Sequence, residues 1–278
     1  MTTTLRPTGP IQHETDGARA RSYEVCVNSR PVGAIELATV PRFGSRAGAI
    51  RSLRIDEADR RRGRGTVAAL AAEEVLRGWG CDQVQVSVPR EATAATALAA
   101  VLGYTERGRS MLKSLGEPPE LPADVEARPM TELEFRPWLA AGVEAYAQDW
   151  IERGVAADQA RTLSKAGHAK ILPDGLASPD TEISVLVHRG EVVGTLFVGR
   201  NEVRPGEQAA YVYDVEVVEG QRGHGHGRSL MLLAERGALA SGIRLLGLHV
   251  FAGNTPALRL YQSLGYETTT VHSYKPLL

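Results

Sequence analysis

The chain contains little cysteine and no long hydrophobic run. Its two cysteines, Cys26 and Cys81, are too few for a disulfide framework and lack metal-ligand spacing, so we expect two structural thiols in a reducing compartment. No segment approaches the ~20 apolar residues of a membrane-spanning helix, and Met1 to Pro10 lacks the basic region and apolar core of a secretory signal. We therefore expect a soluble, cytoplasmic, globular protein with no membrane partner.

An excess of charge of either sign is also absent. The 278 residues carry 32 basic and 33 acidic side chains, a net charge of −1, which argues against a strongly basic nucleic-acid binder. The length permits one large domain or two of roughly 100–150 residues, each able to bury a core. Arginine is the default cation, so clusters of arginine say little about a ligand. The lysines are Lys113, Lys165, Lys170 and Lys275.

Three short patterns occur twice in the same order, which indicates an internal duplication. The second copy of each lies 160 to 162 positions after the first, a spread that chance does not readily produce. We therefore predict two related domains. The paired patterns are Pro31-Val32-Gly33-Ala34 with Val192-Val193-Gly194-Thr195, Arg62-Gly63-Arg64-Gly65 with Arg222-Gly223-His224-Gly225, and Leu102-Gly103-Tyr104 with Leu264-Gly265-Tyr266.

A proline-rich stretch between the copies marks a linker. Pro118, Pro119 and Pro122 lack an amide donor and disfavour helix at and before each ring. We place a first domain at 1–116, the linker at 117–124 and a second domain at 125–278. The second copy has about 70 residues before its Val-Gly pattern and the first has only some 30. The extra residues therefore belong to the second domain.

The second copy alternates strands and helices around a mixed sheet. Thr131 to Glu134 has the pattern of a capping box and predicts a helix to about Arg153. The predicted fold class is α/β with a mixed sheet. The other expected elements are a helix over 156–169, a hairpin of 181–187 and 191–198, a strand over 211–218, a helix over 228–241, a strand over 246–250, a helix from Thr255 to Gly265 and a strand over 268–274.

The loop from Gln221 to Gly227 joins a strand to a helix and has the composition of an anion site. Its glycines let a ligand approach the backbone, and the unpaired amides of the first helical turn would face it together with the positive end of the helix dipole. A diphosphate is the natural ligand. The spacing differs from the dinucleotide pattern Gly-x-Gly-x-x-Gly and lacks the Gly-Lys-Ser/Thr of a triphosphate loop. A tight turn without a ligand is the structural alternative.

This loop, with Arg222-x-x-Gly225-x-Gly227 after the strand Tyr213 to Val217, resembles the acyl-CoA signature of the GNAT N-acyltransferase superfamily. Asn254, seven residues before Tyr261, and the following Leu264-Gly265-Tyr266 resemble a later motif of that family. The resemblance covers nearly all of 125–278. It implies two tandem GNAT folds, of which the first is truncated and degenerate, and it implies acetyl-CoA or another acyl-CoA as co-substrate.

The resemblance also implies roles for the residues around the loop. The loop amides would hold the CoA diphosphate, and the bulged strand before the loop would pair with the pantetheine arm and polarise the thioester carbonyl. The implied coenzyme-binding residues are Val215, Val217, Gln221, Arg222, Gly223, His224, Gly225, His226, Gly227, Arg228, Ser229 and Asn254.

Acyl transfer needs an unprotonated amine, stabilisation of the oxyanion and a proton for the departing thiolate. By resemblance, Tyr261 is the expected general acid, with an ordinary phenol pKa near 10. Its helical spacing with Leu260 and Leu264 leaves a core tyrosine as the alternative. Asn254 resembles the family asparagine that contacts the pantetheine arm or an active-site water, with capping of its helix as the alternative.

Two carboxylates are candidates for the general base. Asp214 and Glu216 lie on the same side of their strand by alternation, near where family members often place an acceptor-binding or proton-accepting carboxylate. Ordinary surface carboxylates are the alternative. His224 and His226 lack an accompanying ligand cluster, so we expect them to border the diphosphate and expect no metal. Residues expected to shape the acceptor pocket, or simply to pack in the core, are Trp138, Tyr146 and Trp150.

The first copy has lost residues that acyl transfer would need. In the overlay, Ala99 falls on Tyr261, Ala92 on Asn254 and Val67 on Gly227. An alanine cannot donate a proton, and a β-branched residue at the helix start would crowd a phosphate. We predict that this domain is not catalytic and supports the second or walls its acceptor cleft. The arginines between Arg60 and Arg64 are expected to form a solvated loop, with an anion site as the alternative.

We expect an N-acyltransferase that moves an acetyl or other small acyl group from acyl-CoA to a primary amine, most simply of a small molecule, by direct attack. The tandem arrangement resembles that of actinobacterial transferases such as mycothiol synthase, but the truncated first copy departs from it. Two other functions stay open. One is a GNAT-like transferase that takes its acyl group from aminoacyl-tRNA or a carrier protein, with the arginine run on a nucleic-acid backbone. The other is a non-catalytic CoA-binding regulatory module.

Overall fold

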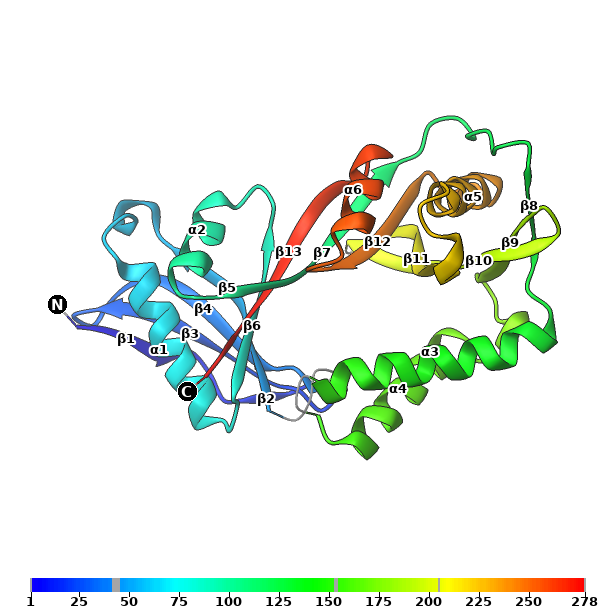
Figure 1. Cartoon of the computed structure of the whole chain (residues 1–278). Helices are drawn as coiled ribbons and strands as arrows, with labels where there is room; N and C mark the ends of the chain where they lie inside the picture. The colour runs from blue at the N-terminus through cyan, green and yellow to red at the C-terminus, as the bar shows by residue number, and fades with distance from the viewer. Residues whose placement is uncertain (1, 42–45, 153–154, 205, 278) are drawn as a thin grey trace. The chain divides into compact units, whose positions relative to one another are not determined.

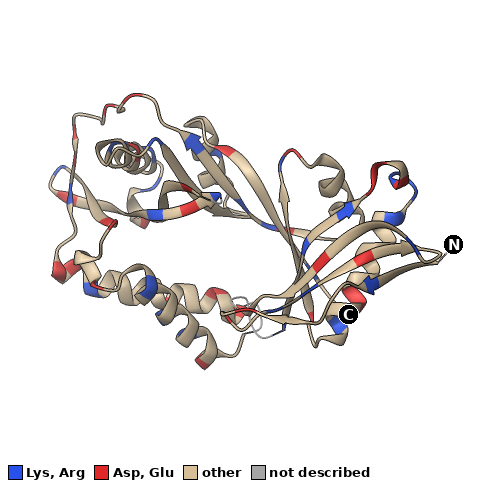
Figure 2. Cartoon of the chain, turned by 180° about the vertical axis from the view of Figure 1, so that it is seen from behind, with Lys and Arg blue, Asp and Glu red and all other residues tan. Residues whose placement is uncertain are grey.

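The computed structural model describes residues 2–41, 46–152, 155–204 and 206–277, and the chain forms two compact units (Figure 1). Unit 1 comprises Met1–Gly108 and Thr270–Leu278, and unit 2 comprises Arg109–Thr269. Basic and acidic residues are interspersed along both units (Figure 2). In the described ranges, no helix combines the length and apolar character that crossing a bilayer requires.

Unit 1 is a sheet with two helices. The sheet has the order β1-β3-β4-β5-β6-β13, and β2 pairs with β3. Helix α1 packs its small residues Ala68, Ala69 and Ala72, together with Leu76, into a core formed with the strands. The elements are β1 (Thr3–Pro7), β2 (Gln12–His13), β3 (Arg19–Val27), β4 (Arg30–Thr39), β5 (Ala47–Ile55), η2 (Glu57–Asp59), α1 (Arg64–Gly78), β6 (Gln83–Pro89), α2 (Thr93–Val101) and β13 (Glu267–Pro276).

Unit 2 is a mixed sheet, as the sequence predicts, with the order β7-β12-β11-β10-β9-β8. Helices α5 and α6 contribute to one core, around Leu196 and Leu230, whereas α3 contributes to a separate core around Phe135 and Val185. The elements are β7 (Thr105–Ser114), β8 (Val125–Pro129), α3 (Glu132–Glu152), α4 (Ala157–Ile171), η3 (Gly175–Ala177), β9 (Glu182–His188), β10 (Glu191–Arg204), β11 (Glu207–Val217), η4 (Glu219–Gln221), α5 (His226–Ala240), β12 (Leu245–Phe251) and α6 (Thr255–Ser263).

The predicted capping box begins α3. The backbone amide of Thr131 donates to the Glu134 carboxylate at 2.9 Å, and the Thr131 hydroxyl donates to the same oxygen at 2.7 Å. Arg128 also donates to Glu134, and its hydrogen bond is the main reason that the pKa of this carboxyl falls to about 2. Glu134 is therefore ionised at neutral pH and satisfies the Thr131 amide at the start of the helix.

The two units repeat the same strand register at a constant displacement of 162. The parallel pair β5–β6 runs from Ala47↔Gln83 to Ile50↔Val86, and β11–β12 runs from Ala210↔Leu246 to Val212↔Leu248. Each sheet carries a bulge in the preceding antiparallel pair, at Arg51 in unit 1 and at Tyr213 in unit 2. These positions also differ by 162.

This register explains the repeated Val-Gly pattern. A Cβ atom at Gly194 would lie 2.5 Å from the carbonyl oxygen of Glu216 on β11, and a Cβ at Gly33 would collide with the carbonyl oxygen of Arg54 on β5. The backbones approach so closely at these two glycines that a side chain does not fit.

The register also corrects one predicted overlay. The left-handed residue before α1 is Gly63 (φ 73°), and the one before α5 is Gly225 (φ 87°). Gly65, not Val67, is therefore the counterpart of Gly227. The expected loss of the closing glycine in the first copy is wrong.

Two strands pass from one unit to the other. Strand β7 runs through the boundary at Gly108, and β13 runs through the boundary at Thr269. The residues of β13 from Thr270 pair antiparallel with β6 in unit 1, and Leu277 lies buried in the core of that unit. Unit 1 thus receives its final strand from the C-terminal end of the second copy.

Each exchanged strand carries a lysine into a buried polar cluster. In unit 2, Lys113 of β7 donates to Glu235 of α5 at 2.6 Å, and the Glu235 side chain is 5% exposed. In unit 1, Lys275 of β13 donates to Glu73 of α1 at 2.8 Å, and Glu73 is equally buried. Lys113 and Lys275 are 162 positions apart, and so are Glu73 and Glu235. Two of the four lysines in the chain therefore form these ion pairs.

The two cysteines lie inside unit 1. Cys26 and Cys81 are free thiols, 1% and 4% exposed, and the pKa of Cys81 is raised chiefly by burial. Their placement agrees with the structural role expected for them.

Candidate functional site

The candidate site begins where two parallel strands of unit 2 separate. Among the described residues, β11 pairs with β12 only from Ala210 to Val212, although β11 continues to Val217 and β12 to Phe251. The bulge at Tyr213 lies at this point and turns the strand. The edge of β11 from Asp214 to Val217 therefore faces a gap in the sheet, where backbone groups can pair with an extended ligand. Val215 and Val217 pack part of their side chains against the core beside α5.

The glycine loop lies at the end of the same strand. After η4, Gly223 (φ 83°) and Gly225 (φ 87°) adopt left-handed conformations, and α5 begins at His226. Gly225 is the N-cap and supplies no side-chain acceptor, so the amides at the start of α5 stay available to a ligand. A Cβ atom at either glycine would meet nothing within 4 Å, so the space over the loop is open. These features fit a diphosphate.

The polar residues around the loop are partly engaged with protein groups. The Arg222 Nε donates to the carbonyl of Val217 at 3.3 Å, and the Arg228 guanidinium donates to the Ser263 hydroxyl at 2.6 Å. Ser229 is buried, and Gln221 is half-buried beside the loop. Gly227 lies where a Cβ would be 3.3 Å from the Leu260 side chain, so α5 and α6 approach closely here.

Tyr261 lies on α6 with its ring largely buried. It is 6% exposed and belongs to the core beside α5, with an edge contact to Tyr266 at 6.1 Å between ring centroids. Burial, and then the negative charge of Asp214, raise the pKa of the Tyr261 phenol to about 12. The phenol is therefore protonated at neutral pH and electrostatically coupled to the carboxylate. The core packing named above as the alternative is present, and it holds the ring beside the candidate site.

Asn254 caps the same helix. Its side-chain oxygen accepts from the Ala257 amide at 3.2 Å, so the expected capping alternative is present in the structure. The side chain is exposed at the start of α6.

Asp214 is the more enclosed of the two candidate bases. Burial raises its pKa above the usual 3.8, and the charge of Glu216 adds to the effect. Hydrogen bonds from the Trp138 indole and the Val215 amide, and the charge of His168, act in the opposite direction. Glu216 points to the same side of β11 but is exposed. A carboxylate with a raised pKa is a stronger base than an ordinary aspartate, which suits it to accept a proton.

Aromatic rings from α3, α4, β10 and β11 contact one another, and the Trp138 indole among them donates to this carboxylate. Trp138 packs edge-on to Phe197, whose ring stacks on Tyr213 with centroids 5.1 Å apart. Tyr146 contacts the His168 ring at 6.1 Å and the Trp150 ring at 5.8 Å. Of the aromatic residues predicted to shape the acceptor pocket or the core, Trp150 is buried, Trp138 packs against the core and Tyr146 is exposed.

Sequence reasoning missed His168. Its Nδ1 lies 2.9 Å from the Ser164 carbonyl oxygen, one helical turn earlier on α4, and its charge acts on Asp214. The carbonyl is an acceptor only, so Nδ1 carries the hydrogen and Nε2 is left with a lone pair in the neutral ring. No local pattern identifies this histidine, because its proximity to Asp214 depends on the packing of α4.

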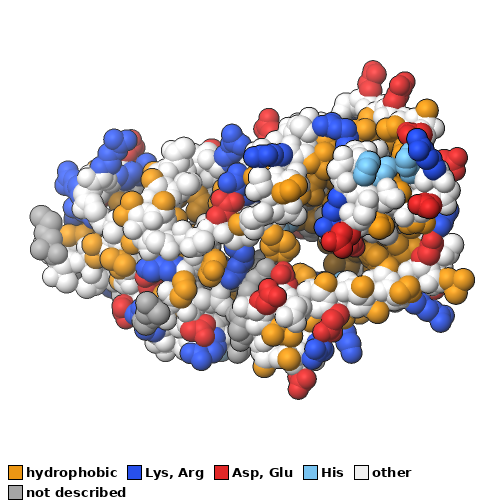
Figure 3. Space-filling view, in the orientation of Figure 1, with side chains coloured by type: hydrophobic (Ala, Val, Ile, Leu, Met, Phe, Trp, Pro, Cys, Tyr) orange, Lys and Arg blue, Asp and Glu red, His pale blue; other side chains and the backbone are white. Residues whose placement is uncertain are grey.

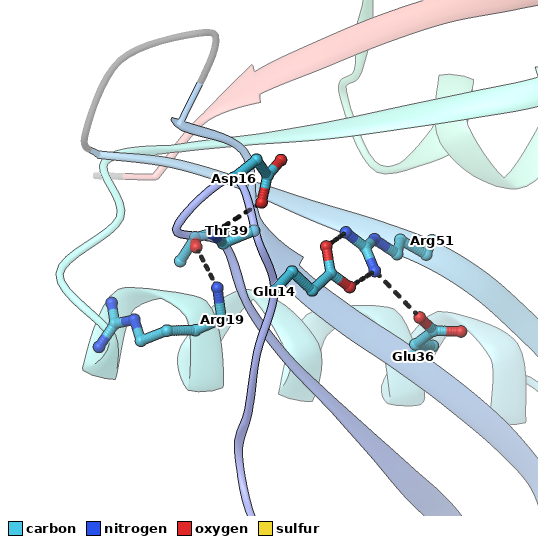
Figure 4. Close-up of polar contacts among 7 residues, drawn as sticks. Glu14, Asp16, Arg19, Glu36, Thr39 and Arg51 are labelled. Carbon is cyan, nitrogen blue, oxygen red and sulfur yellow. Dashed lines mark hydrogen bonds and ion pairs between the residues drawn. The ribbon is translucent and has the colours of Figure 1, made fainter.

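Unit 1 has different side chains at the equivalent positions. The constant displacement places Ser52 at Asp214, Arg54 at Glu216, Ala92 at Asn254 and Ala99 at Tyr261. At the bulge, Arg51 ion-pairs with Glu14 and also contacts Glu36 at 3.5 Å, as Figure 4 shows.

Comparisons with known proteins match both copies. The family model described as "Acetyltransferase (GNAT) family" matches residues 4–104 and 142–266. The uncharacterized N-acetyltransferase YycN of Bacillus subtilis is 33% identical over 151 residues, which cover 54% of this chain and 96% of that protein. The mycothiol acetyltransferase of Saccharomonospora viridis is 26% identical over 278 residues, covering 95% of this chain and 86% of that protein.

Solved structures share the tandem fold. A tandem GNAT protein from the clavulanic acid biosynthesis pathway has a TM-score of 0.52 at 19% identity, over 96% of this chain and 85% of that one. A GCN5-related N-acetyltransferase from Sphaerobacter thermophilus has a TM-score of 0.57 at 21% identity, over 92% of this chain and 80% of that one. These similarities concern the fold alone, and they confirm the predicted tandem arrangement.

Proposed function

Because this chain belongs to the acetyltransferase (GNAT) family and is an acetyltransferase enzyme, we propose that it moves an acetyl or other small acyl group from acyl-CoA to the primary amine of a small molecule by direct attack. The observation that carries this proposal is the gap between β11 and β12. The unpaired edge of β11, the open glycine loop at its end, the half-buried Asp214 carboxylate and the protonated Tyr261 phenol beside that carboxylate support the proposal.

The proposed coenzyme contacts follow from the open backbone groups. The amides from Gly223 to Gly227 would hold the diphosphate at the positive end of α5. The backbone amide of Val217 would pair with the pantetheine arm along the edge of β11, and the Val215 amide would join it by exchanging its hydrogen bond to the Asp214 carboxylate for one to the arm. The remaining polar candidates beside these groups are Gln221, Arg222, Arg228, Ser229 and Asn254.

The proposed proton transfers use Asp214 and Tyr261. The amine nitrogen attacks the thioester carbon, the C–S bond breaks, and the thiolate takes a proton from the Tyr261 hydroxyl. The proton lost by the amine passes to Asp214, with Glu216 as the more solvated alternative acceptor. Burial makes the carboxylate more basic, which favours its role, and it keeps the phenol protonated until the thiolate forms while making it a weaker acid.

We also propose that unit 1 is not catalytic. Ser52, Ala92 and Ala99 stand where unit 2 has a carboxylate, an amide and a phenol. The two glutamates on Arg51 occupy the region beside the bulge of unit 1 (Figure 4).

The direct test is thiol release from acetyl-CoA and other acyl-CoA compounds against pooled primary amines. Tyr261→Phe should lower turnover by about 10²–10⁴, the usual contribution of a general acid, while CoA binding is kept. Tyr274→Phe in unit 1 is the matched control and should leave turnover unchanged. Turnover by Tyr261→Phe at the wild-type rate would remove this residue from the mechanism.

Two outcomes would favour the other functions. CoA binding in a calorimeter without thiol release across a broad amine panel would indicate a non-catalytic binding module. Binding of aminoacyl-tRNA that weakens steeply as salt rises would indicate a different acyl donor.

A further inference from the structure

Three histidine rings gather at the start of α5. His226 is the first residue of the helix, and its ring centroid lies 5.0 Å from that of His188 at the end of β9 and 6.2 Å from that of His224 in the loop. Figure 3 shows histidine side chains together on the surface of unit 2. The His188 Nε2 is 3.1 Å from the Asp124 carboxylate. We call His188, His224 and His226 the histidine cluster.

His226 carries an unsatisfied polar atom. The residue is 4% exposed, and among the described residues its Nε2 has no hydrogen-bond partner. A buried ring nitrogen without a partner costs free energy that a well-packed apolar residue would not. The free protein therefore retains at the helix start a group whose interactions are incomplete. The described residues contain no group of three or more His, Cys, Asp or Glu side chains that could hold a metal ion.

The surroundings of His226 oppose its protonation in the free protein. Burial lowers its pKa most, followed by the charges of His188 and His224, whereas Asp124 acts in the opposite direction. The helix dipole also disfavours a cation at an N-terminus. Arg189 is a further positive charge that acts on Asp124.

We propose that the histidine cluster is a protonatable part of the coenzyme site, so that binding of the coenzyme phosphates is coupled to uptake of a proton by these imidazoles. This inference rests on the proposed function, because it takes the glycine loop as the phosphate site. Negative charge at the start of α5 removes the penalty for an imidazolium there. The added proton in turn attracts the phosphates, because linkage is reciprocal.

The coupling has a measurable size. One linked proton changes the dissociation constant by about tenfold per pH unit, with tighter binding at lower pH. The phosphate monoester of CoA has a second pKa near 6, so this group can also take up a proton on binding. Dephospho-CoA lacks that monoester and keeps the diphosphate, so proton uptake with this probe comes from the protein.

The test is isothermal titration calorimetry of the full chain with dephospho-CoA near pH 6.5, in buffers of different ionisation enthalpy. A positive proton uptake is expected for the wild type, and His226→Gln should remove most of it. His224→Gln is an exposed second variant that leaves the packing intact and should reduce the uptake. His13→Gln, an exposed histidine of unit 1, is the matched control and should change nothing.

The outcomes separate this inference from the proposed function. Binding of CoA and dephospho-CoA without proton uptake, or with uptake that both His226→Gln and His224→Gln retain in full, would overturn the role of the histidine cluster and leave the proposed function standing. If dephospho-CoA binds too weakly, the difference in uptake between wild type and His224→Gln with CoA decides the question. Absence of any CoA binding by the folded wild type would overturn the proposed function itself.

Discussion

Removing Lys113 should destabilise unit 2 by breaking the ion pair that its strand brings to α5. Glu235 is 5% exposed, and its main cationic partner is the Lys113 ammonium at 2.6 Å. Lys113→Met leaves this carboxylate buried without compensation, which typically costs about 3–5 kcal/mol when a buried pair is broken. Because the Lys113 side chain is 22% exposed, water softens the loss and we expect the lower end, about 3 kcal/mol.

The assay is urea unfolding combined with hydrogen exchange read separately for each unit, because two units need not unfold together. Lys113→Met should lower protection in unit 2, and the equivalent Lys275→Met should lower it in unit 1. Lys170→Met, an exposed position on α4, is the control and should stay within about 0.5 kcal/mol of the wild type. The double variant Lys113→Met with Glu235→Leu should recover most of the stability. A loss below about 1 kcal/mol, or a double variant no better than the single one, would refute this reasoning.

Three further predictions concern the site and its support. Asp214→Asn should remove the acid limb of the pH–rate profile, because turnover must rise as pH passes upward through the raised pKa of this carboxyl; an unchanged limb would exclude it as the base. Gly194→Ala should cost about 2–4 kcal/mol in thermal unfolding, since its Cβ would meet the Glu216 carbonyl at 2.5 Å, whereas Gly220→Ala has open space and should be nearly neutral. Asn254→Ala should lose about 1 kcal/mol with the cap of α6, and no loss would contradict the observed hydrogen bond.

The sequence predicted the elements with strong local signals. The hairpin at His188-Arg189-Gly190 is confirmed, and its turn has positive φ at Arg189 and Gly190, which suits an Xaa-Gly hairpin. The helix at Thr131 is confirmed because a capping box fixes its first residue. Strand β8 was missed, since only Val125 of its five residues is buried and no alternation of apolar residues marks it.

The misplaced overlay has a specific cause. Glycine recurs every second residue in both loops, so Gly63 and Gly65 can be aligned either with Gly223 and Gly225 or with Gly225 and Gly227. Backbone conformation resolves the ambiguity, because only Gly63 and Gly225 begin their helices in the left-handed region. The domain limits at 116 and 125 and the roles of the site residues stay predictions.

The exchange of β7 and β13 affects the order in which the two units can finish folding during synthesis. Unit 1 begins at the first residues of the chain, yet its outermost strand beside β6 comes from 270–276, which the ribosome produces after all of unit 2. Until those residues emerge, β6 presents an open edge that any extended segment could pair with. Synthesis of the first unit therefore finishes only when the second has been made.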